Sequence, residues 1–324
     1  MTGASLVSIV IPFHNTSPVF MREAIDCVLQ QSYPSWELLL VDDGSAPECT
    51  AIASSYAEQR PDQVHYLEHP GHQHRGASAT RQLGIDCARG SYIAFLDSDD
   101  VWLPHKLEQQ VAILDTQPDA GMLYGNTLYW YSWTGRREDS RRDYLPKLGV
   151  PPGRLYMPPV LLSLYLRGKA AVPCPCSVLA RRTVVEQTGG FEARFHGNVD
   201  DQVFYAKLCL AAPVFVAGEC WDKYRQHPSS STAVAARQGK LARDYVAFLS
   251  WLEAYLVQLQ ITDREVRRAL RRQLWYHGRF QSSGMPASTQ RRVRWVKKWI
   301  LRLEEHLVPE RLRQWIWLRE SSHE

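Results

Sequence analysis

Short apolar segments alternate with helical segments through the first 130 residues, and this alternation restricts the fold more than any other feature of the sequence. The predicted strands are largely apolar and free of polar alternation, and they span residues 7–13, 36–41, 64–67, 92–96 and 121–129, the first of them rich in β-branched residues. The predicted helices carry apolar residues at helical spacing and span residues 18–31, 47–59, 77–88 and 104–114. Such strands, each followed by a helix, form parallel sheets that are covered on both faces. The sequence therefore predicts an α/β fold.

The pattern is less regular after residue 130. Residues 130–159 contain arginines, prolines and aromatic residues, and we expect a loop or an insertion there. Ordered elements then resume, with strands and helices predicted over residues 176–180, 183–187, 203–210 and 214–217. After Gly239 only helices are predicted, over residues 241–260, 263–277, 291–306 and 310–319.

The net charge of +4 is unevenly distributed along the chain. Residues 240–324 contain 17 Lys and Arg against 9 Asp and Glu, whereas residues 1–239 contain 21 against 25. A mildly acidic body with a basic extension differs from a uniformly basic protein. The total charge therefore gives no reason to expect a nucleic-acid partner, and none is predicted.

Apolar runs and cysteines indicate the compartment. No apolar run reaches the roughly 18 residues of a membrane-spanning helix, and the stretch 6–13 lacks the flanks of a signal peptide. The seven cysteines show no metal-type spacing, and Cys174 and Cys176, the only close pair, are separated by a proline. We expect a cytoplasmic protein, with peripheral attachment to the inner face of the membrane as an open alternative.

Acidic residues follow two of the predicted strands, at the edge where a parallel sheet binds its ligands. Asp97, Asp99 and Asp100 follow the fourth strand, and Asp42 and Asp43 follow the second. Three carboxylates within four residues repel one another, and a hard ion such as Mg²⁺ or Mn²⁺ relieves this repulsion. Each cluster taken alone is more typical of an acidic turn or helix cap. Their placement at one sheet edge favours a functional site.

A basic stretch from His72 to Arg81, which includes Arg75, opens the helix before the Asp97 cluster. Helix N-termini and arginine side chains attract phosphate groups. A capped helix with solvated arginines is the alternative, and it is equally well supported.

Six phrases of the sequence occur in a fixed order. They include Val7-Ser-Ile-Val-Ile-Pro-Phe-His-Asn15, Glu37-Leu-Leu-Leu-Val-Asp-Asp-Gly-Ser45, Gly76-Ala-Ser-Ala-Thr-Arg81 and Gly90-Ser-Tyr-Ile-Ala-Phe-Leu-Asp-Ser-Asp-Asp100. Together they resemble glycosyltransferase family 2, over residues 5–230. The resemblance implies a GT-A fold, which is a Rossmann-like, mostly parallel sheet flanked by helices, here with a C-terminal helical extension. It also implies inverting transfer of a sugar from a nucleotide-diphosphate donor, with UDP favoured.

The resemblance implies roles for individual residues. Asp43, with Asp42 beside it, is expected to recognise the base, and Asp97 the ribose or the sugar. Asp99 is expected to hold Mn²⁺ or Mg²⁺ on the diphosphate. The full set expected at the nucleotide or the donor sugar is Pro12, Phe13, Asn15, Asp42, Asp43, Arg75, Arg81, Asp97 and Ser98.

Two further phrases in the second half match the family. Gly189-Gly-Phe-Glu192 followed by Asp200 and Asp201 resembles the stretch that carries the catalytic base. Asp200 stands where the family has Glu, so either Asp200 or Asp201 is the expected base, and position favours Asp201. The alternative is that both carboxylates merely stabilise the first turn of a helix. Tyr224-Arg-Gln-His227-Pro228 resembles a phrase whose histidine approaches the metal, although a structural role for His227 is equally well supported.

The resemblance also suggests how the chain is divided. Residues 1–125 form the nucleotide-sugar-binding half, residues 126–239 the acceptor-side half of the same catalytic domain, and residues 240–324 a helical basic extension. The expected acceptor is a glycan or a lipid-linked molecule in cell-surface polysaccharide synthesis. A sugar nucleotidyltransferase and a catalytically silent GT-A scaffold protein are the alternatives.

The basic extension contains an amphipathic segment. Residues 293–307 place apolar side chains on one helix face, with arginines, lysines, Trp295 and Trp299 around it. Such a helix packs on the catalytic domain or on another copy of the chain, or it lies in an anionic membrane interface. We expect the segment 240–324 to serve docking, homo-oligomer assembly or peripheral membrane contact.

Overall fold

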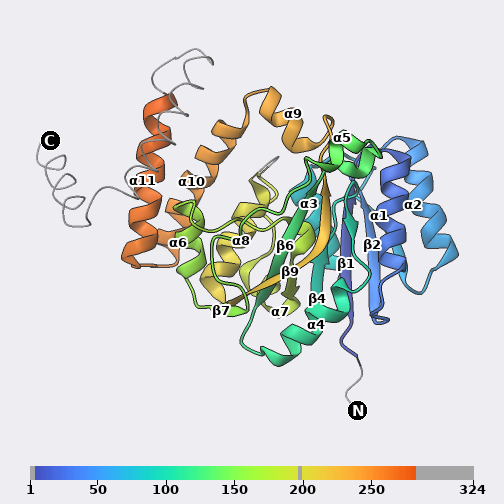
Figure 1. Ribbon diagram of the computed structural model, residues 1–324, viewed down its shortest axis with the longest axis horizontal. Coiled ribbons are helices and arrows are strands. Elements are labelled where there is room, and N and C mark those ends of the chain that lie inside the picture. Colours follow the sequence, from blue (N-terminus) through green and yellow to red (C-terminus); the bar gives the residue numbers. More distant parts are fainter. Residues whose placement is uncertain (1–3, 196–198, 282–324) are drawn as a thin grey trace, which may run out of the picture. The chain divides into compact units, whose positions relative to one another are not determined.

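A central sheet with helices on both faces organises the protein (Figure 1). The computed structural model describes residues 4–195 and 199–281. Within these residues the strands are β1 (Val7–Phe13), β2 (Trp36–Asp42), β3 (Val64–Glu68), β4 (Tyr92–Phe95), β5 (Val101–Trp102), β6 (Met122–Trp130), β7 (Arg154–Tyr156), β8 (Leu179–Arg181) and β9 (Val214–Arg225). The α-helices are α1 (Pro18–Leu29), α2 (Pro47–Gln59), α3 (Ala77–Cys87), α4 (Lys106–Thr116), α5 (Arg137–Ser140), α6 (Val160–Leu166), α7 (Arg182–Thr188), α8 (Asp200–Ala211), α9 (Ser231–Arg237), α10 (Leu241–Gln258) and α11 (Arg264–Gln281). Two short 3₁₀ helices are η1 (Ser132–Thr134) and η2 (Pro175–Ser177).

The sheet is parallel in its first half and mixed in its second. Its strand order is β3-β2-β1-β4-β8-β6-β9-β5, and β7 pairs with the edge of β9. Strands β3, β2, β1 and β4 pair in parallel, whereas β8 runs antiparallel to both β4 and β6. The predicted α/β class is confirmed, and the parallel part carries the strand ends that the sequence singled out.

Alternate side chains of β1 enter two different cores, one on each face of the sheet. Val10 belongs to the core that α3, α6, α7, α8 and α10 cover. Ile9 and Ile11 belong to the core that α1, α2 and α4 cover. Both faces of the strand are therefore buried, and this explains why its sequence shows no polar alternation.

Several elements differ from those predicted. Strand β9 continues to Arg225, beyond the predicted end at residue 217, because the exposed Gly218 and Glu219 interrupt its apolar run without ending the pairing with β6. The short elements β5, α6 and α9 were not predicted, since two to seven residues give too little periodicity to read. The predicted helices 291–306 and 310–319 lie outside the described residues.

Helix α10 belongs to the same compact unit as the sheet, which extends to Leu274. Its Phe248, Leu249 and Leu252 are buried in the core beside α8. In the part of the chain that the structure describes, none of the helices combines the length and apolarity required to cross a bilayer. The division of the chain at residue 240 stays a prediction.

Close packing of α3 on the sheet supports a test of the fold. A Cβ atom at Gly84 would lie 2.5 Å from Val10 Cγ1 and 3.2 Å from Val41 Cγ2. We expect Gly84→Ala to lower the free energy of unfolding by about 1–2 kcal/mol, because overpacking costs about 1–3 kcal/mol and the gain in helix propensity is smaller. Urea denaturation measures the change. Glu58→Ala on the exposed surface of α2 is the control and should leave stability unchanged; a more stable Gly84→Ala protein would contradict the packing.

Candidate active site

The two acidic clusters lie at the carboxyl ends of β2 and β4, on the same edge of the sheet. Strands β2 and β4 flank β1, and Asp42 pairs with Phe13 at the last register position of β1 and β2. Asp97 follows β4 after one intervening residue, Leu96. The prediction that both clusters share one edge of the sheet is confirmed.

Asp43 fixes the basic segment 72–76 against the end of β2. Its Oδ1 accepts the N–H of Arg75 at 2.6 Å, and its two oxygens accept the N–H of Gly76 at 3.1 and 3.0 Å. Gly44 permits this approach, because its φ is +74° and a Cβ atom there would lie 2.9 Å from the carbonyl oxygen of His72. The buried carboxylate therefore holds the basic segment at the sheet edge through backbone donors.

Asp42 closes the turn between β2 and α2. Its side chain is fully buried and accepts hydrogen bonds from Ser45 N–H at 2.8 Å, Thr50 Oγ1 at 2.6 Å and Tyr66 OH at 3.2 Å. These contacts give Asp42 a direct part in shaping the turn. Its predicted contact with a nucleotide stays a prediction.

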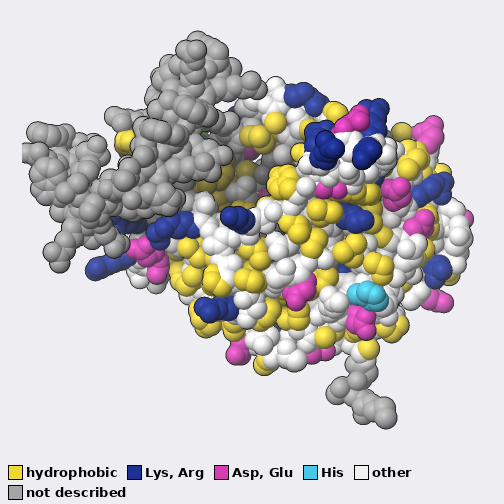
Figure 2. Space-filling view, viewed as in Figure 1, with side chains coloured by type: hydrophobic (Ala, Val, Ile, Leu, Met, Phe, Trp, Pro, Cys, Tyr) yellow, Lys and Arg dark blue, Asp and Glu magenta, His cyan; other side chains and the backbone are white. Residues whose placement is uncertain are grey.

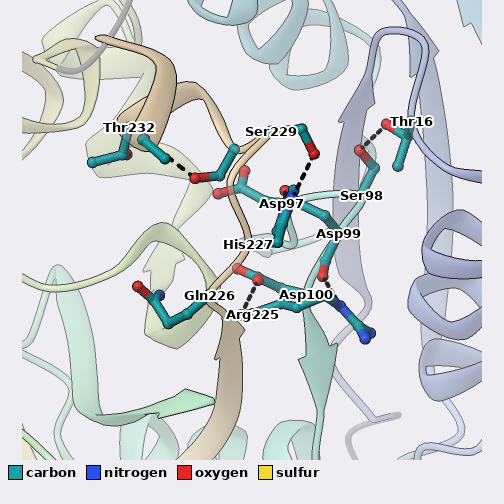
Figure 3. A network of polar contacts seen from close by, with 12 residues as sticks. Thr16, Asp97, Ser98, Asp99, Asp100, Arg225, Gln226, His227, Ser229 and Thr232 are labelled. Atoms are coloured by element: carbon teal, nitrogen blue, oxygen red, sulfur yellow. Dashed lines mark hydrogen bonds and ion pairs between the residues drawn. The ribbon is translucent and has the colours of Figure 1, made fainter. Parts of the chain in front are cut away.

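The loop after β1 connects both acidic clusters. Pro12 and Phe13 are buried in the strand, whereas Asn15 is exposed with a left-handed φ of 49°. The Asn15 N–H donates to Ser45 Oγ at 3.1 Å, and its Oδ1 accepts the N–H of Ala46 at 2.7 Å. The hydroxyls of Thr16 and Ser98 lie 2.6 Å apart and form a hydrogen bond, which is dashed in Figure 3. Hydrogen bonds thus join three strand-end loops into one surface.

Arg81 joins the Asp97 cluster to the second half of the chain. Its Nη2 donates to Asp97 Oδ1 and its Nη1 to Asp200 Oδ2, both at 2.6 Å. The guanidinium is buried and lies 5.5 Å from the centroid of the Phe191 ring. Burial opposes its charge, but Asp97 and Asp200 outweigh this effect and raise the pKa of Arg81 above its usual range. A single cation therefore bridges two carboxylates that are 103 positions apart in the sequence.

Asp99 and His227 converge at a partly exposed position (Figure 3). Asp99 Oδ2 lies 2.8 Å from His227 Nε2, and His227 Nδ1 lies 2.8 Å from the hydroxyl of Ser229. The Asp99 side chain is 26% exposed, so its carboxylate is accessible from outside the protein. A carboxylate oxygen beside an imidazole nitrogen, open on one side, suits Mn²⁺ or Mg²⁺ that also binds phosphate oxygens. The residues present fit the expected ion.

Asp100 faces the protein interior. Its Oδ1 accepts the N–H of Arg225 at 2.8 Å, and the thiol of Cys176 donates to its Oδ2 at 3.0 Å. Burial raises the pKa of Asp100 well above its usual range, and the charges of Asp99 and Asp97 add to this effect. Asp100, Cys174 and Cys176 bring their ligand atoms within 4.8 Å of one another. The three carboxylates therefore point to three different partners.

Arg225 is a site residue that the sequence did not single out. Its buried guanidinium lies over the rings of Phe20 and Trp130, at 4.2 and 4.6 Å from their centroids, and Glu23 pairs with it. Its Nε donates to the carbonyl oxygen of Asp99 at 2.7 Å. Arg225 thus positions Asp99 from the backbone side. The signal available in the sequence was its place two residues before His227.

Asp200 and Asp201 occupy the first turn of α8. Asp201 Oδ1 accepts the N–H of Gln202 at 2.7 Å. Burial raises the pKa of Asp201 to about 7, and the neighbouring Asp200 carboxylate adds to this effect. Burial also raises the pKa of Asp200, although Arg81 opposes it. Arg81 therefore holds Asp200, while Asp201 has a pKa in the range of an efficient general base.

Sequence comparison relates the chain to glycosyltransferases. It is 37% identical over 239 residues to the uncharacterized glycosyltransferase RT0329 of Rickettsia typhi, covering 73% of this chain and 69% of that protein. It is 37% identical over 111 residues to the putative teichuronic acid biosynthesis glycosyltransferase TuaG of Bacillus subtilis, covering 34% of this chain and 42% of that protein. It is 34% identical over 121 residues to the UDP-Glc:alpha-D-GlcNAc-diphosphoundecaprenol beta-1,3-glucosyltransferase WfgD of Escherichia coli, covering 37% of this chain and 45% of that protein. The matched region spans less than half the length of the last two relatives.

Solved structures share the fold. TarS 1-349 of S. aureus in complex with UDP-GlcNAc gives a TM-score of 0.60 at 16% identity, covering 81% of this chain and 69% of that one. The mannosyltransferase PcManGT from Pyrobaculum calidifontis, in complex with GDP-Man and Mn²⁺, gives a TM-score of 0.55 at 17% identity, covering 97% and 84%. The family model for glycosyl transferase family 2 matches residues 8–189. With acidic strand-end clusters joined on a GT-A sheet and a family match over more than half its length, the chain belongs to glycosyl transferase family 2.

Proposed function

We propose that this chain is an inverting, metal-dependent glycosyltransferase in cell-surface polysaccharide synthesis, with a UDP-sugar as the favoured donor and a glycan or lipid-linked acceptor. The Arg81 bridge carries the proposal, because it brings Asp97 from the donor half and Asp200 from the acceptor half into one site. The names of TuaG and WfgD and the UDP-GlcNAc complex of TarS support the acceptor class and the donor.

On the donor side, Asp99 and His227 would hold the divalent ion, while Asp97 would orient the ribose or the sugar. When bound, Mn²⁺ or Mg²⁺ supplies positive charge for the diphosphate that leaves in the reaction. Arg225 keeps the Asp99 backbone in place, and Arg81 keeps the Asp97 carboxylate in place. Asp43 would recognise the base of the nucleotide at the end of β2, beside the loop that contains Asn15.

On the acceptor side, Asp201 would act as the general base. It takes the proton from the acceptor hydroxyl as that oxygen attacks the anomeric carbon on the face opposite the leaving diphosphate. One displacement forms the new glycosidic bond, breaks the bond to the diphosphate and inverts the anomeric configuration. Asp200 is a positioning residue in this scheme, because its carboxylate is paired with Arg81.

A transfer assay tests the proposal directly. Purified protein is incubated with UDP-, GDP- and dTDP-sugars, Mn²⁺ and acceptors that include diphosphate-linked lipids. The proposal predicts transfer from a UDP-sugar, with the product's anomeric configuration opposite to that of the donor by NMR. Retention of configuration, or release of pyrophosphate in place of a nucleoside diphosphate, would exclude it.

Removal of the Asp99 charge tests the metal site. We expect Asp99→Asn to lower kcat/KM for the donor by about 100-fold or more, because charge stabilisation of a leaving group supplies effects of this size. Release of nucleoside diphosphate is measured as Mn²⁺ is titrated. Asp62→Asn, at an exposed position outside the site, is the matched control. An unchanged Mn²⁺ dependence in Asp99→Asn would remove the metal role from this residue.

The raised pKa of Asp201 predicts the pH profile. The base acts only when ionised, so kcat/KM should fall as the pH decreases through about 7 and level off above it. In Asp200→Asn one negative charge is lost, which favours ionisation of Asp201 and moves the acidic limb to lower pH. An acidic limb that does not move would show that another group controls it.

Loss of the buried cation tests the Arg81 bridge. We expect Arg81→Met to lower the free energy of unfolding by about 3–5 kcal/mol, because the buried Asp200 carboxylate and the partly exposed Asp97 carboxylate lose their common partner. The loss should be largest at mildly alkaline pH and smaller at mildly acidic pH, where the buried Asp200, whose pKa burial raises, takes up a proton. Urea denaturation at both pH values measures it, with Arg81→Lys as the variant that keeps the charge. An equal loss at both pH values would contradict the electrostatic explanation.

A further inference from the structure

Exposed apolar side chains gather in the segment 136–172, which lies between β6 and β8. Nine large apolar side chains are exposed in the described residues, and five of them belong to this segment. Met157 is 58% exposed and Leu145 is 52% exposed, which is unusual for side chains of this size. The five residues are Tyr144, Leu145, Met157, Val160 and Val172.

The same segment exposes many cations and one anion. Glu138 is its only exposed acidic residue, since Asp139 is buried against Thr134 and Arg142 and Asp143 accepts the N–H groups of Tyr131 and Ser132. Figure 2 shows dark blue side chains gathered over α5, with yellow side chains beside them. The exposed cations are Arg136, Arg137, Arg141, Arg142, Lys147, Arg154, Arg167 and Lys169.

Contacts with the sheet and within the segment hold this surface in place. The rings of Tyr144 and Tyr129 stack with centroids 4.8 Å apart, and their backbones form a bridge. The N–H of Ala171 donates to the carbonyl of Leu148 at 2.9 Å, and β7 pairs with the edge of β9. The exposed apolar side chains therefore project from an ordered surface.

We propose that the segment 136–172 docks the protein on a bilayer of anionic phospholipids. Lysine and arginine side chains are attracted to anionic headgroups, and neighbouring apolar side chains enter the interface below them. A second copy of the chain would bring these cations against the same cations. Within the described part of the chain, only Arg142 and Arg167 of the eight form ion pairs with acidic side chains, so the like charges would repel. A soluble polyanion would pair with the cations but would leave Leu145, Met157 and Val160 in water.

The proposed surface is connected to the candidate active site. The segment leads into η2, and the Cys176 thiol there accepts the N–H of Asp97 at 3.4 Å. Docking through this segment would hold the acceptor half of the site close to a membrane. The proposal concerns binding alone, so its failure would leave the transfer chemistry untouched.

Vesicle sedimentation of the full chain tests the proposal. The vesicles contain either phosphatidylcholine alone or equal parts of phosphatidylcholine and phosphatidylglycerol. One variant combines Arg141→Gln, Lys147→Gln and Arg154→Gln, and a second combines Leu145→Ser and Met157→Ser. Arg60→Gln with Val19→Ser is the matched control, because both residues are exposed and lie outside the segments 136–172 and 240–324. Every variant keeps residues 240–324, so differences report on the segment 136–172.

We expect the control to bind the anionic vesicles like the parent protein. Each basic residue near an anionic surface contributes roughly five-fold in affinity, so the triple variant should lose about 100-fold. The apolar variant should lose about ten-fold or more, since insertion of its two side chains is removed. Unchanged binding of the triple variant would overturn the proposal. A loss in the triple variant alone, with the apolar variant unaffected, would show a polyanion site and would also overturn it.

Amide hydrogen exchange of the parent protein gives a readout that does not depend on variants. On anionic vesicles we expect slower exchange over residues 141–160 and unchanged exchange over α2. Protection confined to residues after 240, with none over 141–160, would place the docking surface elsewhere and refute the proposal.

Discussion

The buried ion pairs of Arg81 connect the fold to the site. Its guanidinium is the cation that meets Asp97 at the end of β4 and Asp200 at the start of α8. Without it, Asp97, Asp200 and Asp201 would be three partly or fully buried carboxylates in one region, and their repulsion would oppose the approach of α8 to the sheet. The charge that lets α8 pack against the sheet also fixes the Asp97 and Asp200 side chains, which belong to the site proposed to bind donor and acceptor.

The sequence predicted the fold well wherever both faces of a strand are buried. Strands β1, β2 and β4 are mostly apolar and buried throughout, and their pairing places Asp42 and Asp97 at one edge, as expected. The extent of β9 was not predictable, because half of its residues are partly exposed and Gly218 interrupts the run. Its pairing with β6 sustains the strand, and a pairing partner leaves no mark in local periodicity.

Residue types at the site were predictable, and their partners were not. The three carboxylates of the Asp97 cluster are almost identical in sequence context, yet each has a different partner. Asp97 pairs with Arg81, Asp99 contacts His227, and Asp100 accepts a hydrogen bond from the buried Cys176. Asp100 is the carboxylate that faces the interior, and it does so because of a contact with Cys176, a residue more than 70 positions away in the sequence. Arg225 was missed for the same reason, since its stacking on Phe20 and Trp130 exists only after distant segments pack together.

The two-sided burial of β1 limits how an enzyme on this scaffold can acquire a new substrate. Every side chain from Val7 to Phe13 is buried in the protein, so a substitution at any position of this strand would disturb the packing. A change of specificity must therefore arise in the loops beyond the strand ends, where Asn15 and the segment 72–76 are held by hydrogen bonds. The sheet supplies a fixed platform, and new selectivity is acquired by exchanging the loops that surround it.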